Sequence, residues 1–290
     1  MNILATLLIL VSHADSAYEN DALSRYAIAC DLIYEQTSDK DYLKASEKCL
    51  NLLILKMHDF GWSEKAPYDS YQDGTINTLE TTYTYQTTIA GFAFLRHYKI
   101  TGNPKYLMIC EKIADHLLNQ IGYWKAPGKL AMWYSSSEYD RKYRVHNVNW
   151  YTASYLSQLN YNEYKAYIDD ILSYELSTRR GYNWYYCEDL PERGVNDMFH
   201  WAMIGNAVRE IYEVTQDDRL LFYKDMQKAY RNTFVKQTFL NNYWRTDLAY
   251  AEAVRFLQDK SLFDLYEFKS FKDQVCLAWY CYVYAELLNK

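Results

Sequence analysis

The sequence predicts an all-α protein built from repeated helical hairpins, and three observations carry that prediction. Tyrosines end helical runs at intervals of 64, 57 and 57 residues, at Tyr34, Tyr98, Tyr155 and Tyr212. A tryptophan follows each of them about one helix later, at Trp62, Trp124, Trp184 and Trp244. Nine Gly and four Pro among 290 residues favour long helices. A unit of this length holds two helices and a loop, and such units bury their apolar faces only by stacking.

The first two repeat units have clear boundaries. Asn20-Asp21 is a capping pair that predicts a helix over 22–34, and Ser38-Asp39 turns the chain into a partner helix over 41–57. Asn103-Pro104 separates the second pair, because proline suits the first turn of a helix. We expect that second pair at 78–100 and 104–120.

The longest loop, over 121–145, contains a polar aromatic stretch at 132–137 that predicts a short hairpin. Further helices are expected at 147–159, 162–178, 197–214, 218–236, 247–258, 261–270 and 273–289. Short turns alternate with long loops, so the long loops gather at one end of the stack. We expect a crater and the functional residues there.

Composition indicates one folded domain over 1–290, with 50% hydrophobic and 23% charged residues and no linker. The formal net charge of −6 argues against a nucleic-acid partner, because phosphate binding needs clustered Lys and Arg. Tyrosine is abundant at 32 residues, and aromatic rings suit both helix interfaces and sugar-binding clefts. The composition does not specify an oligomeric state.

Two interpretations fit residues 1–17. The apolar run Ile3 to Val11 precedes small residues, as in a cleaved signal peptide, which would place the protein in the periplasm or outside the cell. The run lacks a basic flank and is too short to span a membrane. Counting 3–13 as the first helix gives an even total of twelve, as a closed ring of hairpins requires. Scattered cysteines without a Cys-x-x-Cys pair also suit a reduced compartment, so we expect a cytoplasmic protein.

Polar and aromatic residues open the helices that follow long loops. Asp197-x-x-His200 places a carboxylate in a first helical turn with an imidazole on the same face, as an acid/base pair or as a cap with an interfacial histidine. His146-Asn147-x-Asn149 sets three hydrogen-bonding groups beside Trp150. Asp247 repeats the pattern of a carboxylate that begins a helix behind a tryptophan loop.

These groups fit several reactions on sugars. Glycoside hydrolysis usually needs two carboxylates across the scissile bond, and Asp197, Asp247, Glu188 and Asp189 are candidates. A lyase or epimerase instead removes a carbon-bound proton with a His or Tyr base. The sequence has no Gly-rich phosphate loop, no nucleophile elbow and no zinc-binding helix, so we expect neither a metal nor another cofactor. Asp169-Asp170 fits a solvated helix face better than a metal site.

The order of these motifs resembles that of bacterial six-hairpin toroid proteins, which are similar to six-hairpin glycosidases and are associated with polysaccharide biosynthesis. The matching stretches are Asp59 to Trp62, Ala90 to Leu107, Trp133 to Tyr155 and Gly181 to Thr215. The resemblance implies an (α/α)6 toroid. Its wider relatives include glycoside hydrolases, polysaccharide lyases and sugar epimerases, and the fold does not choose between them. This chain departs from the pattern at Trp201, where the relatives carry a threonine.

The leading hypothesis is an enzyme that acts on a polysaccharide or its oligosaccharide unit. Its expected catalytic residues are Asp197, His200, His146 and Asp247. Its expected sugar-binding residues are Trp62, Trp133, Tyr134, Arg144, Asn147, Asn149, Trp150, Trp184, Tyr185, Trp201 and Trp244. The alternatives are a non-catalytic glycan-binding or scaffold protein, which uses the same rings without an acid/base pair, and a terpenoid cyclase lined by aromatic rings.

Overall fold

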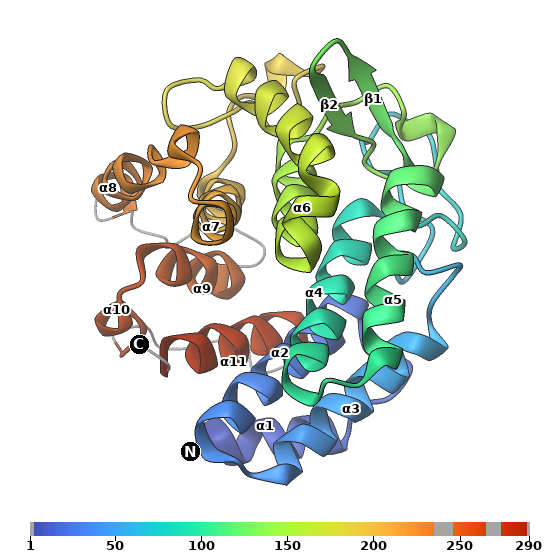
Figure 1. Ribbon diagram of the computed structural model, residues 1–290, viewed down its shortest axis with the longest axis vertical. Helices are drawn as coiled ribbons and strands as arrows, with labels where there is room; N and C mark the ends of the chain where they lie inside the picture. Colours follow the sequence, from blue (N-terminus) through green and yellow to red (C-terminus); the bar gives the residue numbers. More distant parts are fainter. Residues whose placement is uncertain (1–2, 235–245, 265–273, 289–290) are drawn as a thin grey trace.

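The computed structural model describes residues 3–234, 246–264 and 274–288, and these fold into a closed ring of helical hairpins (Figure 1). The inner helices are α2 (Asn20–Thr37), α4 (Thr84–Thr101), the first half of α6 (His146–Thr178), α7 (Met198–Thr215), α9 (Thr246–Leu257) and α11 (Gln274–Leu288). Each inner helix packs on the next, and α11 packs on α2 to close the ring. The predicted (α/α)6 toroid is therefore confirmed.

The outer layer covers these inner helices. It comprises α1 (Ile3–Ser12), α3 (Lys40–Leu55), α5 (Pro104–Asp115), the π-helical turn η1 (His116–Ile121), the second half of α6, α8 (Tyr223–Phe234) and α10 (Lys260–Asp264). A β-hairpin, β1 (Tyr123–Ala126) and β2 (Lys129–Met132), packs on α6. The hairpin thus comes earlier than the predicted stretch at 132–137, with which it shares only Met132. Its turn contains Gly128, whose positive φ of 65° a turn of this kind requires. Within the described ranges, no helix is long and apolar enough to cross a membrane.

The Tyr-x-x-Thr motif builds the short turns. In the second unit the Thr101 hydroxyl donates to the His97 carbonyl and accepts from the Asn103 amide, while the Gly102 amide donates to the Tyr98 carbonyl. Asn103 then caps α5. The first and fourth units repeat this arrangement at Thr37 and Thr215. The motif is thus a signature of the hairpin turn, with a left-handed residue between the threonine and the next cap.

The degenerate third unit has no such turn. The chain passes from the inner to the outer half of α6 at Asn160, whose φ of −162° and ψ of 90° are not helical. Asn160 caps the outer half by accepting from the Glu163 amide at 3.4 Å. The two helices predicted at 147–159 and 162–178 are therefore present as the two halves of α6, separated at Asn160.

The repeated tryptophans are structural in two copies. Trp62 is fully buried and its indole N–H donates to the Leu53 carbonyl at 2.9 Å. Trp184 is equally buried and donates to the Glu175 carbonyl at 2.8 Å. Each indole thus satisfies a carbonyl near the end of an outer helix, where such groups lack a helical partner.

The N-terminal segment packs as a helix of the outer layer. Leu7 and Val11 of α1 are buried, with 0% and 1% exposure, and α1 contacts α2 and α3. The Lys48 ammonium donates to the Val11 carbonyl at 2.9 Å and to the Ser12 carbonyl at 2.7 Å. These contacts tie the end of α1 to α3.

The left-handed turn residues generate a stability prediction. Gly102 has φ 66° and no atom within 4 Å of an added Cβ, so Gly102→Ala costs about 1 kcal/mol from backbone strain alone. Ser38 takes the same place with φ 56°, so Ser38→Gly adds about 0.5–1 kcal/mol. Denaturant unfolding of both variants measures these changes. Equal stability of Gly102→Ala and the unaltered protein would contradict this account of the repeat.

Candidate active site

Long loops cover the end of the ring where the inner helices begin. A buried carboxylate organises two of these loops: Asp140 accepts from the Asn77 amide at 2.8 Å and from the hydroxyls of Ser70 and Ser135 at 3.1 and 2.5 Å. Isolated antiparallel β-bridges also join these loops, including one between Val145 and Cys187. The start of α6 is therefore held against the loop that precedes α7.

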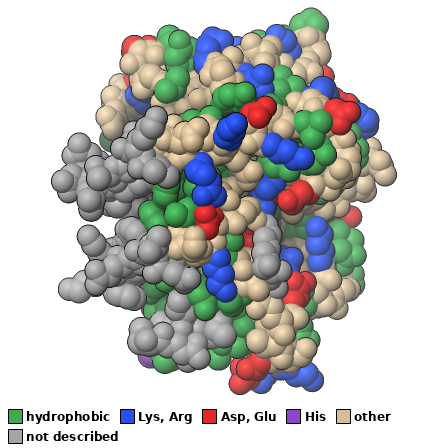
Figure 2. Space-filling view, turned by 90° about the vertical axis from the view of Figure 1, so that its left-hand side faces the viewer, with side chains coloured by type: hydrophobic (Ala, Val, Ile, Leu, Met, Phe, Trp, Pro, Cys, Tyr) green, Lys and Arg blue, Asp and Glu red, His purple; other side chains and the backbone are tan. Residues whose placement is uncertain are grey.

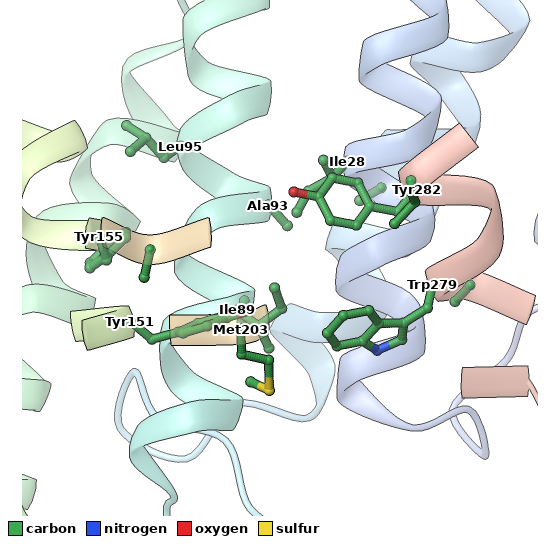
Figure 3. Close-up of a cluster of buried hydrophobic side chains, with 14 of the residues drawn as sticks. Ile28, Ile89, Ala93, Leu95, Tyr151, Tyr155, Met203, Trp279 and Tyr282 are labelled. Carbon is green, nitrogen blue, oxygen red and sulfur yellow. The ribbon is translucent and has the colours of Figure 1, made fainter. Parts of the chain in front are cut away.

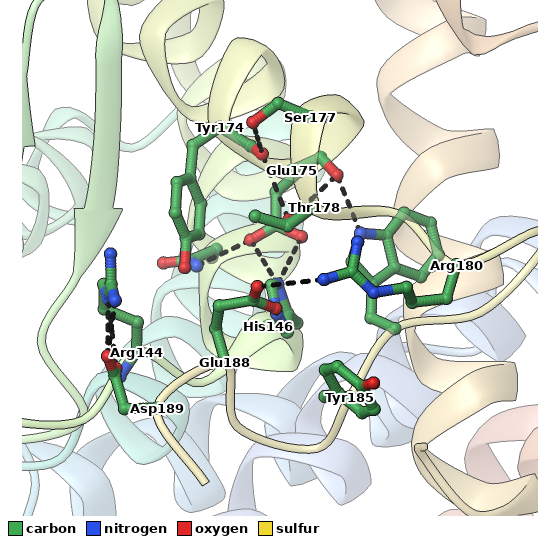
Figure 4. A network of polar contacts seen from close by, with 12 residues as sticks. Arg144, His146, Tyr174, Glu175, Ser177, Thr178, Arg180, Tyr185, Glu188 and Asp189 are labelled. Atoms are coloured by element: carbon green, nitrogen blue, oxygen red, sulfur yellow. Dashed lines mark hydrogen bonds and ion pairs between the residues drawn. The ribbon is translucent and has the colours of Figure 1, made fainter. Parts of the chain in front are cut away.

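His146 lies in a buried network at this end (Figure 4). Its Nδ1 is 2.9 Å from Glu175 Oε2 and its Nε2 is 3.3 Å from Glu188 Oε2, with the imidazole fully buried. Asn149 is also fully buried; it donates to Glu175 Oε1 at 2.6 Å and accepts from the Met132 amide at 2.6 Å. His146 and Asn149 thus join the inner half of α6 to its outer half and to β2.

The charge of His146 follows from these contacts. Burial lowers its pKa, but the attraction of Glu175, its hydrogen bond and the contact with Glu188 together raise the pKa to about 9. The ring is therefore an imidazolium at neutral pH, with both nitrogens occupied. This arrangement suits a role in positioning the Glu188 loop better than the predicted role as a base.

Arginines beside this network are also paired. The Arg144 amide and Nε donate to Asp189 Oδ2 at 2.7 and 3.0 Å, and its guanidinium lies 4.8 Å from the centre of the Trp124 ring. Arg180 donates to Glu188 at 3.3 Å and lies over Tyr185 (Figure 4). The predicted sugar-binding residues Arg144 and Tyr185 therefore lie close to His146. Arg144 is paired with Asp189, and Arg180 beside Tyr185 is paired with Glu188.

A group of tyrosines, called here the tyrosine collar, fills the adjacent part of the long-loop end. Its members are Tyr68, Tyr71, Tyr83, Tyr134 and Tyr143, with neighbouring ring centres 4.1 to 6.2 Å apart. Burial raises the pKa of Tyr134, with smaller contributions from nearby tyrosines and Glu64. The Tyr71 hydroxyl is buried and has no hydrogen-bond partner among the described residues. The collar thus offers protonated phenols as hydrogen-bonding groups.

The pair Asp197 and His200 lies at the start of α7. Asp197 Oδ1 accepts from the His200 amide at 2.9 Å, which caps the helix, and Oδ2 is 2.8 Å from His200 Nδ1. Ring centres of Tyr186 and Phe199 lie 5.0 and 5.1 Å from the imidazole. The His200 side chain keeps 21% exposure, and its Nε2 has no partner among the described residues. The capping interpretation is confirmed, and the second carboxylate oxygen contacts the imidazole, as an acid/base pair would also require.

The remaining predicted residues occupy different environments. Trp150 is fully buried, as are Trp62 and Trp184, so none of these three rings has a face open to a sugar. Trp201 is half-buried, but its indole donates to the Tyr182 carbonyl at 2.6 Å and its ring packs on Tyr230.

The other predicted positions are half-buried or buried, or they fall outside the description. Trp133 and Tyr134 are half-buried, and the Asn147 Oδ1 atom is buried without a partner in the described part of the chain. Trp244 lies outside the described residues. Asp247 belongs to α9, but its side chain is outside the description.

Several residues of this end escaped the sequence analysis. Glu175 pairs with His146 from 29 positions away, across the kink at Asn160, and no local pattern links the two. Glu64 accepts from Gln86 at 3.0 Å beside the tyrosine collar. Tyr186 and Phe199 are sequence neighbours of the predicted residues Tyr185 and His200, and this adjacency is the sequence signal that points to them.

Surface charge is mixed. Figure 2 shows acidic and basic side chains intermingled on one face of the molecule, without a patch of one sign.

In the described ranges, no group of three or more His, Cys, Asp or Glu side chains is arranged to hold a metal ion. All six cysteines are buried free thiols.

No protein-family model matches the sequence, and no curated protein matches it either. Solved structures do match in fold. An α-1,6-mannanase of Salegentibacter, an inactive variant bound to α-1,6-mannotriose, aligns over 99% of both chains with TM-score 0.67 and 10% identity. A Listeria innocua protein aligns over 94% of this chain and 85% of its own, with TM-score 0.65 and 12% identity. Cellobiose 2-epimerase of Spirochaeta thermophila aligns over 95% and 76%, with TM-score 0.57 and 12% identity. These similarities establish the toroid fold.

The buried imidazolium predicts a pH dependence of stability. The folded pKa of about 9 exceeds the unfolded value of about 6.5, so the contribution of His146 is full below about pH 6.5 and disappears as pH rises through 9. That shift corresponds to about 3 kcal/mol. His146→Gln removes this dependence of the unfolding free energy on pH. The unfolding free energies of the unaltered protein and the variant therefore converge toward high pH. Denaturation at several pH values measures it, and a constant difference across the range would refute the assignment.

Proposed function

We propose that this chain is a carbohydrate-active enzyme that moves a proton on a sugar bound at the long-loop end. One observation carries the proposal: the partly exposed imidazole of His200 is held at Nδ1 by Asp197, while Nε2 has no partner among the described residues. A histidine oriented in this way can serve as a general base or acid. Tyr186 lies beside it, and Tyr186 also packs against the cluster that contains Tyr71 of the tyrosine collar.

The geometry assigns a role to each group. Asp197 accepts a hydrogen bond from the Nδ1–H group, which leaves the Nε2 lone pair free to take a proton from a sugar carbon next to a carbonyl. The resulting imidazolium is stabilised by the same carboxylate. The carbonyl becomes an enol or enolate, and the protonated tyrosine hydroxyls are suitable donors to its oxygen. When the enolate turns over within the site, the imidazolium returns its proton to the opposite face of that carbon, which completes an epimerisation and regenerates the neutral histidine.

Structural neighbours support a sugar substrate without naming it. One is described as a cellobiose 2-epimerase and another as a sugar epimerase from a ruminal bacterium. The mannanase structure is an inactive variant in which two adjacent aspartates are replaced. The adjacent aspartates here are Asp169-Asp170 and Asp217-Asp218, and Asp169 and Asp217 share Arg219 beside the short turn after α7. We therefore favour proton transfer over hydrolysis by such a pair.

The setting of the reaction belongs to the same proposal. We propose a cytoplasmic protein associated with polysaccharide biosynthesis. Cleavage after Ala14 or Ala17 would remove α1 and uncover the surface that Leu7 and Val11 bury, which favours retention of this segment. Mass spectrometry of the native protein tests this, with the residues of α1 expected to be retained. A start at Asp15 or Tyr18 would move the protein to the periplasmic or secreted class.

A solvent-exchange assay tests the reaction. The purified protein is incubated with cellobiose or α-1,6-mannobiose in deuterated water, and the sugars are analysed by mass. We expect deuterium on the carbon next to the reducing-end carbonyl. Gain of one water would instead indicate hydrolysis, an unsaturated product would indicate a lyase, and a bound but unchanged sugar would favour the non-catalytic glycan-binding alternative.

The variant Asp197→Asn separates the two roles of Asp197, orienting the His200 imidazole and capping α7. Asparagine is a good N-cap, so the melting temperature is expected to change little, whereas loss of the carboxylate lowers turnover by about a hundredfold or more. Asp217→Asn is the matched control, because Asp217 caps the turn at the other end of α7. His200→Gln is expected to abolish turnover. Full activity of Asp197→Asn would remove this pair from the mechanism.

A further inference from the structure

A cavity lies on the ring axis, toward the end where the inner helices finish. It has a volume of about 400 Å³, in the range of small-molecule sites, and residues of all six inner helices line it. Arg25 and Tyr151 are buried at its deep end, with 0% and 4% exposure. The side chains of Glu35 and Glu213 are 43% and 57% exposed, so the cavity opens beside the short turns.

A floor of packed side chains separates this cavity from the His200 site. The Arg25 guanidinium lies 3.1 Å from the centre of the Trp279 ring, and both side chains bond to Asp21, at 2.7 and 3.0 Å. Phe199 packs edge-on against Trp279, with ring centres 5.4 Å apart. Because Phe199 also contacts His200, the two sites lie back to back on one axis.

The cavity has two unlike walls. Helices α2 and α4 contribute the apolar side chains Ile28, Leu32, Ile89 and Phe92 and, beside the short turns, the ion pair of Glu35 and Arg96. Helices α7, α9 and α11 contribute the charged side chains Arg209, Glu210, Arg255 and Glu286. Figure 3 shows Tyr282 and Trp279 reaching from α11 toward the side of Ile28 and Ile89. A ligand that fits both walls has one apolar face and a rim of polar groups.

The arginines of the charged wall already have carboxylate partners. Arg255 Nε donates to Glu286 at 2.7 Å and its other nitrogens contact Glu210 and Glu252. Arg209 donates to Glu286 at 3.3 Å. With its positive charge compensated, the wall does not favour an anion. It offers donors and acceptors side by side, which is what hydroxyl groups require.

Three buried polar atoms at the cavity have no partner among the described residues: Arg96 Nε, the Tyr151 hydroxyl and Arg209 Nε. Tyr151 and Arg209 are at least 95% buried, at 4% and 5% exposure. Leaving such groups without hydrogen bonds is costly, so native structures usually satisfy them with water or a ligand. A hydroxyl-bearing ligand can accept from Arg209 and exchange a hydrogen bond with Tyr151.

We propose that this cavity is a second binding site, for a neutral mono- or disaccharide. The C–H face of the sugar ring lies on the wall of Ile28 and Ile89, and its hydroxyls bond to Tyr151, Arg209 and the neighbouring glutamates. Tyr282 is not the stacking platform, because the guanidinium groups of Arg25 and Arg255 lie 5.3 and 4.9 Å from its ring centre. This site is independent of the reaction at His200.

Methyl NMR of isoleucine-labelled protein tests the site. Cellobiose and α-1,6-mannobiose are titrated separately, with glucose 6-phosphate as the anionic comparison. We expect the neutral sugars to shift the Ile28 and Ile89 methyl signals, in the unaltered protein and in His200→Gln, while Ile168 and Ile171 of the outer half of α6 stay fixed. Because His200→Gln disables only the other site, shifts that persist there are independent of turnover.

Tyr151→Phe removes only the unpartnered hydroxyl and is expected to weaken sugar binding about tenfold. Tyr155→Phe is the matched control on the same helix, since its hydroxyl bonds to the Cys110 carbonyl instead; it lowers stability but leaves binding unchanged. The proposal is overturned if no neutral sugar shifts Ile28 and Ile89, if only glucose 6-phosphate does, if the shifts vanish in His200→Gln, or if Tyr151→Phe binds as tightly as the unaltered protein.

Discussion

Closure of the inner ring, where α11 packs on α2, is the constraint on which the rest of the structure depends. A closed ring leaves no free helix face, so polar side chains that point to the axis must find partners inside it. Arg255 does so by joining α7, α9 and α11 through Glu210 and Glu286. Arg25 does so through Asp21 and the face of Trp279. These contacts fill part of the axis and separate the cavity at the short-turn end from the start of α7.

The direction of the helices then makes the two ends chemically different. All inner helices begin at the long-loop end, where free amides and the helix dipole favour a carboxylate. Asp197 uses that position both to cap α7 and to orient His200. His146, by contrast, is enclosed between two glutamates and holds the Glu188 loop in place. The long-loop end is therefore suited to proton transfer, and the short-turn end to binding through compensated charges.

The repeat made the fold predictable, because the Tyr-x-x-Thr motif is a local turn whose hydrogen bonds span four residues or fewer. The roles of the tryptophans were harder to predict. Trp62 and Trp184 looked like sugar platforms, yet each caps an outer helix from nine positions away. The contact between Asp197 and His200 was predictable because it lies within one helical turn. The pairing of Glu175 and the cavity on the ring axis depend on contacts between distant segments, which no spacing in the sequence records.

The central claim is that the Asp197–His200 pair transfers a proton on a bound sugar. Deuterium incorporation into cellobiose or α-1,6-mannobiose, compared between the unaltered protein and Asp197→Asn, tests it most directly. The account predicts deuterium at the carbon next to the carbonyl in the unaltered protein and a loss of about a hundredfold in the variant, with the fold retained. Equal incorporation by both proteins, or a bound sugar that never exchanges, would contradict it.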